Sequence, residues 1–492
     1  MNHDFTRGPI FGPLMGFALP VLAALFLQML YGAVDMMIVG WFCPASDIAA
    51  ASTGGTVMQS LTIVVTGLSL GTTVLLGQKF GEGRSDEMGA VVGASICLFA
   101  AIGAVMAVAM QWLAYYCVLA MRTPPAAFGS ALSYVKICSA GAPFIVAYNV
   151  LSSVFRGMGN SRIPLLSVAI ACAVNIAGDW LLVGPAGMGV AGAAVATVAA
   201  QAVSVLLSLA VIARRGLPFP FSRRDVRFNG AVIRRVLRLG FPIAFQDTLV
   251  NVSFLAITAI VNTLGVVAAA GIGIAERVCG FVMLVPSAYG QAMSTFTAQN
   301  VGAGLPQRAN RALFYAIFSS LAAGLVMGWA SYFHGDALTG LFVQGQPEVT
   351  AAGWDYLRAY SIDCLLTSFL FCFIGYFNGW GRTTFVMWQG IAGAFGVRIP
   401  VSWLMSRAVP VSVWRRPVRR CCRSSCARLR FSGSKEQRPR RRSRMGKRRR
   451  KANFRASRNA RQLSGCRALR SSFLVLLFAV FFPKKSATLP TS

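Results

Sequence analysis

Five acidic side chains interrupt stretches of the chain that are otherwise apolar. They are Asp35, Asp179, Asp247, Glu276 and Asp363. If these stretches cross a membrane, each charge is expensive, because an ionised side chain at the bilayer centre costs at least about 2.5–3.5 kcal/mol by insertion scales. Such carboxylates mark the places where a cation or a proton could be bound.

Two of these acids have a setting that favours ion binding. Asp179 follows Asn175 by four residues in VNIAGDWLLV, so a helix places the amide and the carboxylate on one face. Asp35 lies deep in LYGAVDMMIVG. Oxygen ligands suit a hard cation, and a carboxylate removed from water readily accepts a proton. From the residues alone, the bound ion could be either Na⁺ or H⁺. The residues also leave open a structural role, in which Asn175 and Asp179 tie helices together and Asp35 pairs locally.

The segments that carry these acids have the composition of membrane helices. The chain has 492 residues, of which 55% are hydrophobic and 13% are charged, whereas soluble domains carry about 25% charged residues. The uncharged runs 88–121, 188–213 and 278–307 each exceed the roughly 20 residues that a spanning helix needs. Because these runs are continuous rather than alternating, they indicate an all-α polytopic membrane protein.

Eleven spans are predicted, and the basic residues orient them. The spans are 14–39, 48–76, 88–118, 132–155, 163–183, 189–213, 239–263, 267–298, 312–334, 357–378 and 384–406. The loops after even-numbered spans carry, together with Arg7, 16 basic residues, and the other loops carry two. The positive-inside rule then predicts a cytoplasmic N-terminus. We interpret the basic loops as cytoplasmic loops of a membrane protein and not as a surface that binds nucleic acid.

The two halves of the chain match each other at an offset of about 222 residues. The matched pairs are Pro20 with Pro242, Gly81 with Gly302, Gly83 with Gly304, Tyr134 with Tyr356, Phe155 with Phe377, Gly157 with Gly379 and Gly159 with Gly381. Two homologous halves in an apolar protein predict a transporter with its path between them. We therefore expect an N-terminal bundle over 1–213, a basic linker over 214–238, a C-terminal bundle over 239–408 and a tail over 409–492.

The tail departs from the repeat. The offset maps the apolar stretch 189–212 onto 411–434, which contains seven arginines. Residues 411–492 hold 25 basic residues and one acid, Glu436, whereas residues 1–410 have a net charge of +8. A twelfth helix is therefore missing where the repeat requires one. A frameshift near Pro410 is the favoured explanation; a basic arm that binds anionic lipid or nucleic acid, and an additional domain, are the alternatives.

Several segments resemble the MATE (multidrug and toxic compound extrusion) transporters of bacteria. They are ALPVLAALFLQ, FRGMGNSRIP, GMGVAGAAVATVAAQ and AMSTFTAQNVGAG followed by a basic loop. The resemblance extends over about residues 8–408. It implies two pseudo-symmetric six-helix bundles around a central cleft. It also implies antiport, in which Na⁺ or H⁺ enters as a cationic or amphipathic organic compound leaves, with no cofactor besides this coupling ion.

The resemblance also implies a cation site in the N-terminal bundle. The family uses an Asp on helix 1, an Asn and an Asp one turn apart on helix 5, and a Thr on helix 6, which match Asp35, Asn175, Asp179 and Thr197. In this family, straight and bent forms of helix 1 are linked to the state of the acid cluster. Pro20 removes a backbone hydrogen bond in that helix and is a candidate hinge; a static kink is the alternative.

The second half lacks the corresponding acids. Some relatives carry a Glu on helix 7 and an Asp on helix 10, at positions that are Val250 and Thr367 here. Asp363 lies one turn before Thr367 and could substitute. For the substrate cleft, which should be wide and mostly apolar with a few polar groups, the candidate residues are Gln28, Tyr31, Met58, Gln246, Asn251 and Met283.

These observations predict a monomeric, multi-pass exporter of small organic cations in the bacterial inner (plasma) membrane, in contact with lipid and without a nucleic-acid partner. The alternatives are a lipid-linked saccharide flippase of the same broad superfamily and a non-functional frameshifted product. A membrane enzyme is disfavoured, because the chain has only two histidines, His3 and His334, and neither an HExxH motif nor a P-loop.

Overall fold

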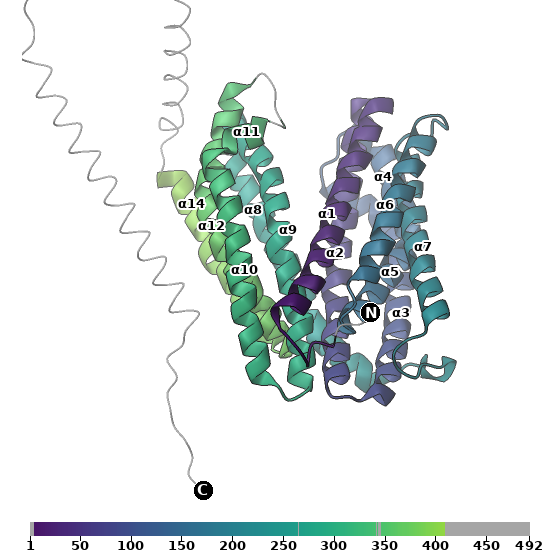
Figure 1. The fold of residues 1–492 in the computed structure, drawn as a ribbon. Helices are drawn as coiled ribbons and strands as arrows, with labels where there is room; N and C mark the ends of the chain where they lie inside the picture. The colour runs from purple at the N-terminus through teal and green to yellow at the C-terminus, as the bar shows by residue number, and fades with distance from the viewer. Residues whose placement is uncertain (1–3, 264, 341, 343–345, 409–492) are drawn as a thin grey trace, which may run out of the picture. The chain divides into compact units, whose positions relative to one another are not determined.

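The computed structural model describes residues 4–263, 265–340, 342 and 346–408, and these residues form a set of helices (Figure 1). The predictions that concern the tail, namely the missing twelfth helix and the frameshift, fall on residues 409–492 and lie outside the described residues.

The helices follow the repeat. The first half forms α1 (Phe11–Phe42), α2 (Ala45–Gly81), α3 (Ser85–Ala120), α4 (Pro125–Ala140), α5 (Ala142–Gly157), α6 (Arg162–Val183) and α7 (Gly189–Arg215). A short turn, η1 (Arg223–Asp225), lies in the linker. The second half forms α8 (Gly230–Asn262), α9 (Val266–Gly302), α10 (Pro306–Phe333), α11 (Gly335–Gly340), α12 (Pro347–Gly379), α13 (Thr383–Ile391), η2 (Ala392–Arg398) and α14 (Ile399–Ala408). We refer to α1–α7 as the N-terminal bundle and to α8–α14 as the C-terminal bundle.

Nine helices of the described ranges are long and apolar enough to cross a membrane, and the bent pair α4–α5 makes a tenth span. The predicted span 132–155 corresponds to this pair and contains a bend, because α4 and α5 meet at 51° around Gly141. Pro143 is the second residue of α5, where its ring and its missing N–H prevent the preceding helix from continuing unbroken. The predicted span 384–406 is also divided: α13 and α14 flank a π-helical stretch, Ala392–Arg398.

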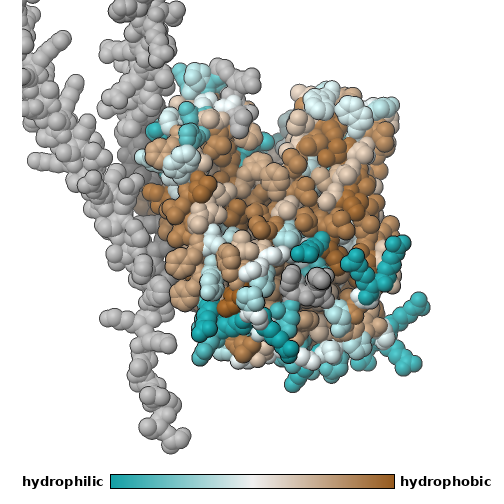
Figure 2. Space-filling view, viewed as in Figure 1, coloured by the Kyte–Doolittle hydropathy of each residue, from teal (hydrophilic) through white to brown (hydrophobic). Residues whose placement is uncertain are grey.

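The outer surface is that of a protein immersed in lipid. Large apolar side chains face outward, among them Trp112, Phe318 and Val105, whose exposed fractions are 78%, 71% and 65%. Figure 2 shows apolar residues over the middle of the face in view and hydrophilic residues at both ends, with the larger group at the lower end. At this lower end α2 turns into α3 and α9 into α10 (Figure 1), with Arg84 and Arg308 beside those turns. We call it the basic end.

Four of the matched glycines of the repeat share one backbone conformation, which explains why glycine occurs at these positions. Gly83, Gly159, Gly304 and Gly381 adopt positive φ angles of 71°, 76°, 69° and 73°, a conformation that favours glycine. In each case the residue after the glycine donates its N–H to the carbonyl five residues earlier, at 2.8–3.2 Å. This is the Schellman arrangement that ends a helix. The repeat thus conserves four equivalent helix ends at the basic end.

Helix α1 packs against both bundles. In its first half, Phe17 and Val21 share a buried apolar cluster with Phe296 of α9. In its second half, Ile38 shares a different buried cluster with Val135 of α4. α1 therefore connects the C-terminal bundle to the region where Asp35 lies.

Helix α8 makes the complementary crossing. Its first half lies directly against α2: a Cβ atom added to Gly67 would lie 2.5 Å from Ala244 Cα, and one added to Gly71 would lie 2.4 Å from the Val236 carbonyl oxygen. These glycines therefore let the α2 and α8 backbones touch.

Candidate cation site

Small residues bring together the two helices that carry most of the predicted site. A Cβ atom added to Gly178 of α6 would lie 2.9 Å from Ala196 Cβ of α7. The side chains next to these residues, Asp179 and Thr197, come from the facing surfaces of the same two helices. The small-residue run GAAVAT thus permits a close α6–α7 contact, a typical device of membrane helices.

The structure brings the four predicted residues together in two pairs, Asn175 with Thr197 and Asp35 with Asp179. The Asn175 amide Nδ2 donates to Thr197 Oγ1 at 3.5 Å. The Asn175 and Asp179 side chains are buried, with exposed fractions of 1% and 0%. Asp35 of α1 lies close enough to Asp179 for the two carboxyl groups to interact. All four predicted residues therefore line one location between α1, α6 and α7.

Four buried oxygen atoms of this cluster have no hydrogen-bond donor among the described residues. Asp35 Oδ1, Asn175 Oδ1 and both carboxylate oxygens of Asp179 are buried and accept no hydrogen bond from the described residues. The ion pairs found in the described ranges involve neither Asp35 nor Asp179. Buried oxygens without donors are costly, and two neighbouring carboxylates repel each other when both are ionised. The donor set therefore fits a bound cation or one or more protons.

Two tyrosines border the cluster. Tyr31 and Tyr134 both lie near Asp35. The ring of Tyr134 covers Gly54 of α2, where an added Cβ would lie 2.4 Å from its Cδ1 atom. The sequence had marked Tyr134 only as a member of the repeat; its place beside Asp35 depends on the packing of α4 against α2, which no local pattern reveals.

The predicted cleft residues are dispersed. Gln28 lies next to Tyr148, and Tyr31 lies near Asp35. Met58 is buried in the apolar core of the N-terminal bundle, where Ser139 Oγ lies 3.7 Å from its Sδ atom, so packing accounts for it.

The remaining cleft candidates belong to the C-terminal bundle. Gln246 is buried against Gly390, and Met283 is half-buried. Asn251 is exposed and donates to the Asp247 carbonyl oxygen at 3.0 Å. These three side chains form no cluster comparable to the acid cluster of the N-terminal bundle.

The second half keeps one acid–hydroxyl pair. Thr367 Oγ1 donates to Asp363 Oδ2 at 3.2 Å on α12. The two residues that the sequence placed one turn apart are therefore linked, but Asp363 is exposed, unlike Asp179. An asymmetric chemistry of the two halves therefore stays a prediction.

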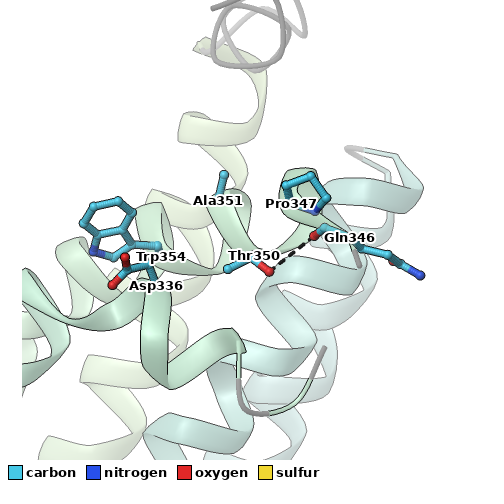
Figure 3. Close-up of a pocket in the computed structure, with 6 residues that line it drawn as sticks. All are labelled: Asp336, Gln346, Pro347, Thr350, Ala351 and Trp354. Atoms are coloured by element: carbon cyan, nitrogen blue, oxygen red, sulfur yellow. Dashed lines mark hydrogen bonds between the residues drawn. The ribbon is translucent and has the colours of Figure 1, made fainter. Parts of the chain in front are cut away.

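A pocket in the C-terminal bundle lies elsewhere (Figure 3). Its lining residues are Asp336, Gln346, Pro347, Thr350, Ala351 and Trp354. They belong to α11, the start of α12 and the residue before it, and the only hydrogen bond drawn among them joins Thr350 Oγ1 to the Gln346 carbonyl oxygen at 3.3 Å. This pocket shares no residue with the acid cluster.

Comparison with known proteins agrees with this arrangement. The sequence model of the family described as MatE matches residues 20–181 and 242–404, one match in each half. The chain belongs to the MATE family. Members of this family are multidrug efflux transporters and not enzymes, which confirms the class predicted from the sequence.

Individual relatives are also described as multidrug resistance proteins. The chain is 27% identical over 400 residues to the probable multidrug resistance protein YpnP of Bacillus subtilis, covering 81% of this MATE chain and 86% of that protein. It is 25% identical over 414 residues to the probable multidrug resistance protein YoeA of the same organism, covering 81% and 87%. A crystal structure of MATE in the straight conformation aligns with a TM-score of 0.78 at 20% identity, covering 82% of this chain and 91% of that one, and shares its fold.

Proposed function

We propose that this MATE protein is a cation-coupled antiporter that exports cationic or amphipathic organic compounds by alternating access. Na⁺ or H⁺ would enter the cell through the site formed by Asp35, Asn175, Asp179 and Thr197. The observation that carries the proposal is the group of buried oxygens in this site that accept no hydrogen bond within the described residues.

Helix α1 provides the physical coupling. Its second half carries Asp35 and packs in the N-terminal bundle, whereas Phe17 and Val21 in its first half pack against α9. Pro20 lies within the first of these regions, between Phe17 and Val21, and lacks the N–H that would bond to the Gly16 carbonyl. A cation or proton that draws Asp35 and Asp179 together would change how α1 joins the two bundles, with Pro20 as the hinge.

Charge suggests the orientation. We place the basic end in the cytoplasm, because basic residues concentrate in cytoplasmic loops of membrane proteins. The N-terminus would then be cytoplasmic in an inner-membrane, multi-pass monomer whose two bundles are joined by the basic linker 214–238. Accessibility of cysteines introduced at Ser85 and at Ser46 to an impermeant thiol reagent tests this: we expect labelling from outside intact cells at Ser46 only, and the reverse result would contradict the orientation.

The functional test is efflux of a cationic dye from cells that express the full chain or its Asp35→Asn variant. A second pair of strains carries the chain with a reading-frame-corrected twelfth helix. We expect the substitution to abolish efflux, because Asn cannot carry the negative charge that binds a cation or takes up a proton. The matched control is Asp47→Asn, which preserves an oxygen to accept the bond that Ser130 Oγ donates to Asp47 at 2.9 Å.

Two results would overturn the proposal. Parental efflux in the Asp35→Asn variant would remove the acid cluster from the coupling mechanism. Transport of an anionic lipid-linked saccharide in place of organic cations would favour the flippase alternative.

A further inference from the structure

The two bundles touch most closely where α2 and α9 end. A Cβ atom added to Gly81 of α2 would lie 1.9 Å from the Gln299 carbonyl oxygen, and one added to Gly302 of α9 would lie 2.1 Å from the Gln78 carbonyl oxygen. Real Cβ atoms do not approach other atoms so closely. The two helices can therefore cross here only because glycine occupies both positions, and the contact is reciprocal.

The glutamines at this crossing exchange hydrogen bonds between the bundles. Gln78 Nε2 in the N-terminal bundle donates to the Gly379 carbonyl oxygen in the C-terminal bundle at 3.0 Å. Gln299 Nε2 in the C-terminal bundle donates to the Gly157 carbonyl oxygen in the N-terminal bundle, also at 3.0 Å. Gln299 is fully buried and Gln78 is half-buried. Donors and acceptors are offset by 221 and 222 residues, so the repeat relates the two bonds.

The acceptors explain why these bonds form at helix ends. Gly157 and Gly379 are the last residues of α5 and α12. The final carbonyls of a helix have no partner within the helix and carry its partial negative charge. Each glutamine thus satisfies an otherwise unpaired carbonyl of the opposite bundle.

We propose that Gln78 and Gln299 are positioning residues that hold the basic end of the two bundles closed, as a two-bond latch that must open in every transport cycle. This inference rests on the proposed alternating access. The two glutamine bonds of the latch join neutral groups, and beside them Arg156 Nη1 of α5 donates to Gln291 Oε1 of α9, a third bond between the bundles. When the bundles separate, water can replace both glutamine bonds. The bonds therefore favour the closed state without preventing it from opening.

The test measures the separation of the bundles at the basic end directly. Spin labels are attached at Ser85→Cys and Gln307→Cys, two exposed positions that the repeat relates, in a full chain whose native cysteines are replaced by alanine. Their distance distribution is recorded for the parent, Gln78→Leu, Gln299→Leu and the double variant. Leucine fills a similar volume but cannot donate. The control is Gln111→Leu, because Gln111 Nε2 also donates to a backbone carbonyl, that of Lys136 at 3.1 Å, but within one bundle.

We expect each single substitution to raise the ratio of long to short distances by about fivefold, the effect of one lost hydrogen bond between the bundles; Gln299→Leu also removes the oxygen that accepts the Phe5 N–H. The double variant should show about the product of the two changes, with Gln111→Leu matching the parent. A double variant whose distribution equals that of the parent overturns the latch. This measurement needs neither substrate nor a cation gradient. Unchanged distances with cation-dependent efflux intact would refute the latch alone. Changed distances without cation-dependent efflux would refute the proposed antiport alone.

Discussion

Replacing Gly302 by alanine should disfavour the state in which the basic end is closed. The added Cβ would lie 2.1 Å from the Gln78 carbonyl oxygen and 2.8 Å from its carbonyl carbon, so the α2 and α9 backbones must move apart by about 1 Å or more. Overpacking of a tight contact typically costs about 1–3 kcal/mol. Because a state with separated bundles avoids this clash, its population should rise by about 5- to 150-fold.

The assay is the distance distribution between spin labels at Ser85→Cys and Gln307→Cys in the cysteine-free background. The matched control is Gly273→Ala on the same helix, where an added Cβ meets no atom within 4 Å. We expect a shift toward longer distances only for Gly302→Ala. Equal distributions for the two variants would refute the argument that this contact sets the closed state.

Three further predictions follow from the packing, the site and the tail. Phe5→Ala should lower the apparent melting temperature, because its ring is fully buried against Phe17 and Phe296 and such truncations cost about 3–5 kcal/mol; a melting temperature equal to that of the parent would contradict the observed docking of residues 5–9. The Asp35→Asn and Asp179→Asn double variant should lose no more dye efflux than either single variant, since the two carboxyls act as a unit; residual efflux in a single variant that disappears only in the double variant would indicate separate roles. We expect the nucleotide sequence around codon 410 to encode about 20 apolar residues in another frame, the length of one span, and the chain as written to transport weakly; full efflux by the 492-residue chain would contradict this.

The sequence predicted the helical membrane fold because that fold depends on composition and on the repeat. The matched glycines at 83, 159, 304 and 381 mark helix ends whose backbone conformation is local, so a single sequence suffices to find them. The residues of the candidate cation site could also be proposed from the sequence: Asp35 is an acid in an apolar run, the Asn175–Asp179 spacing is local, and the family resemblance supplied Thr197.

Long-range packing set the limits of that prediction. Pro143 was a local signal for the bend within the span 132–155. The surrounding residues are apolar on both sides, so the sequence was interpreted as one uninterrupted span. The bonds of Gln78 and Gln299 had no such signal, because each joins segments 142 or 301 residues apart. The one signal in the sequence was that Gln78 and Gln299 are separated by the repeat offset. The pairs that defined the repeat were glycines, aromatic residues and a proline, so the glutamines were not among them.

The most direct test of the central claim is transport by purified protein in proteoliposomes, with Na⁺ and H⁺ gradients imposed separately. The account predicts that one of the two gradients drives accumulation of an organic cation and that Asp179→Asn abolishes this gradient-driven component, while Asp47→Asn preserves it. Accumulation that is insensitive to both gradients, or that is unchanged in Asp179→Asn, would contradict a cation site at Asp35 and Asp179.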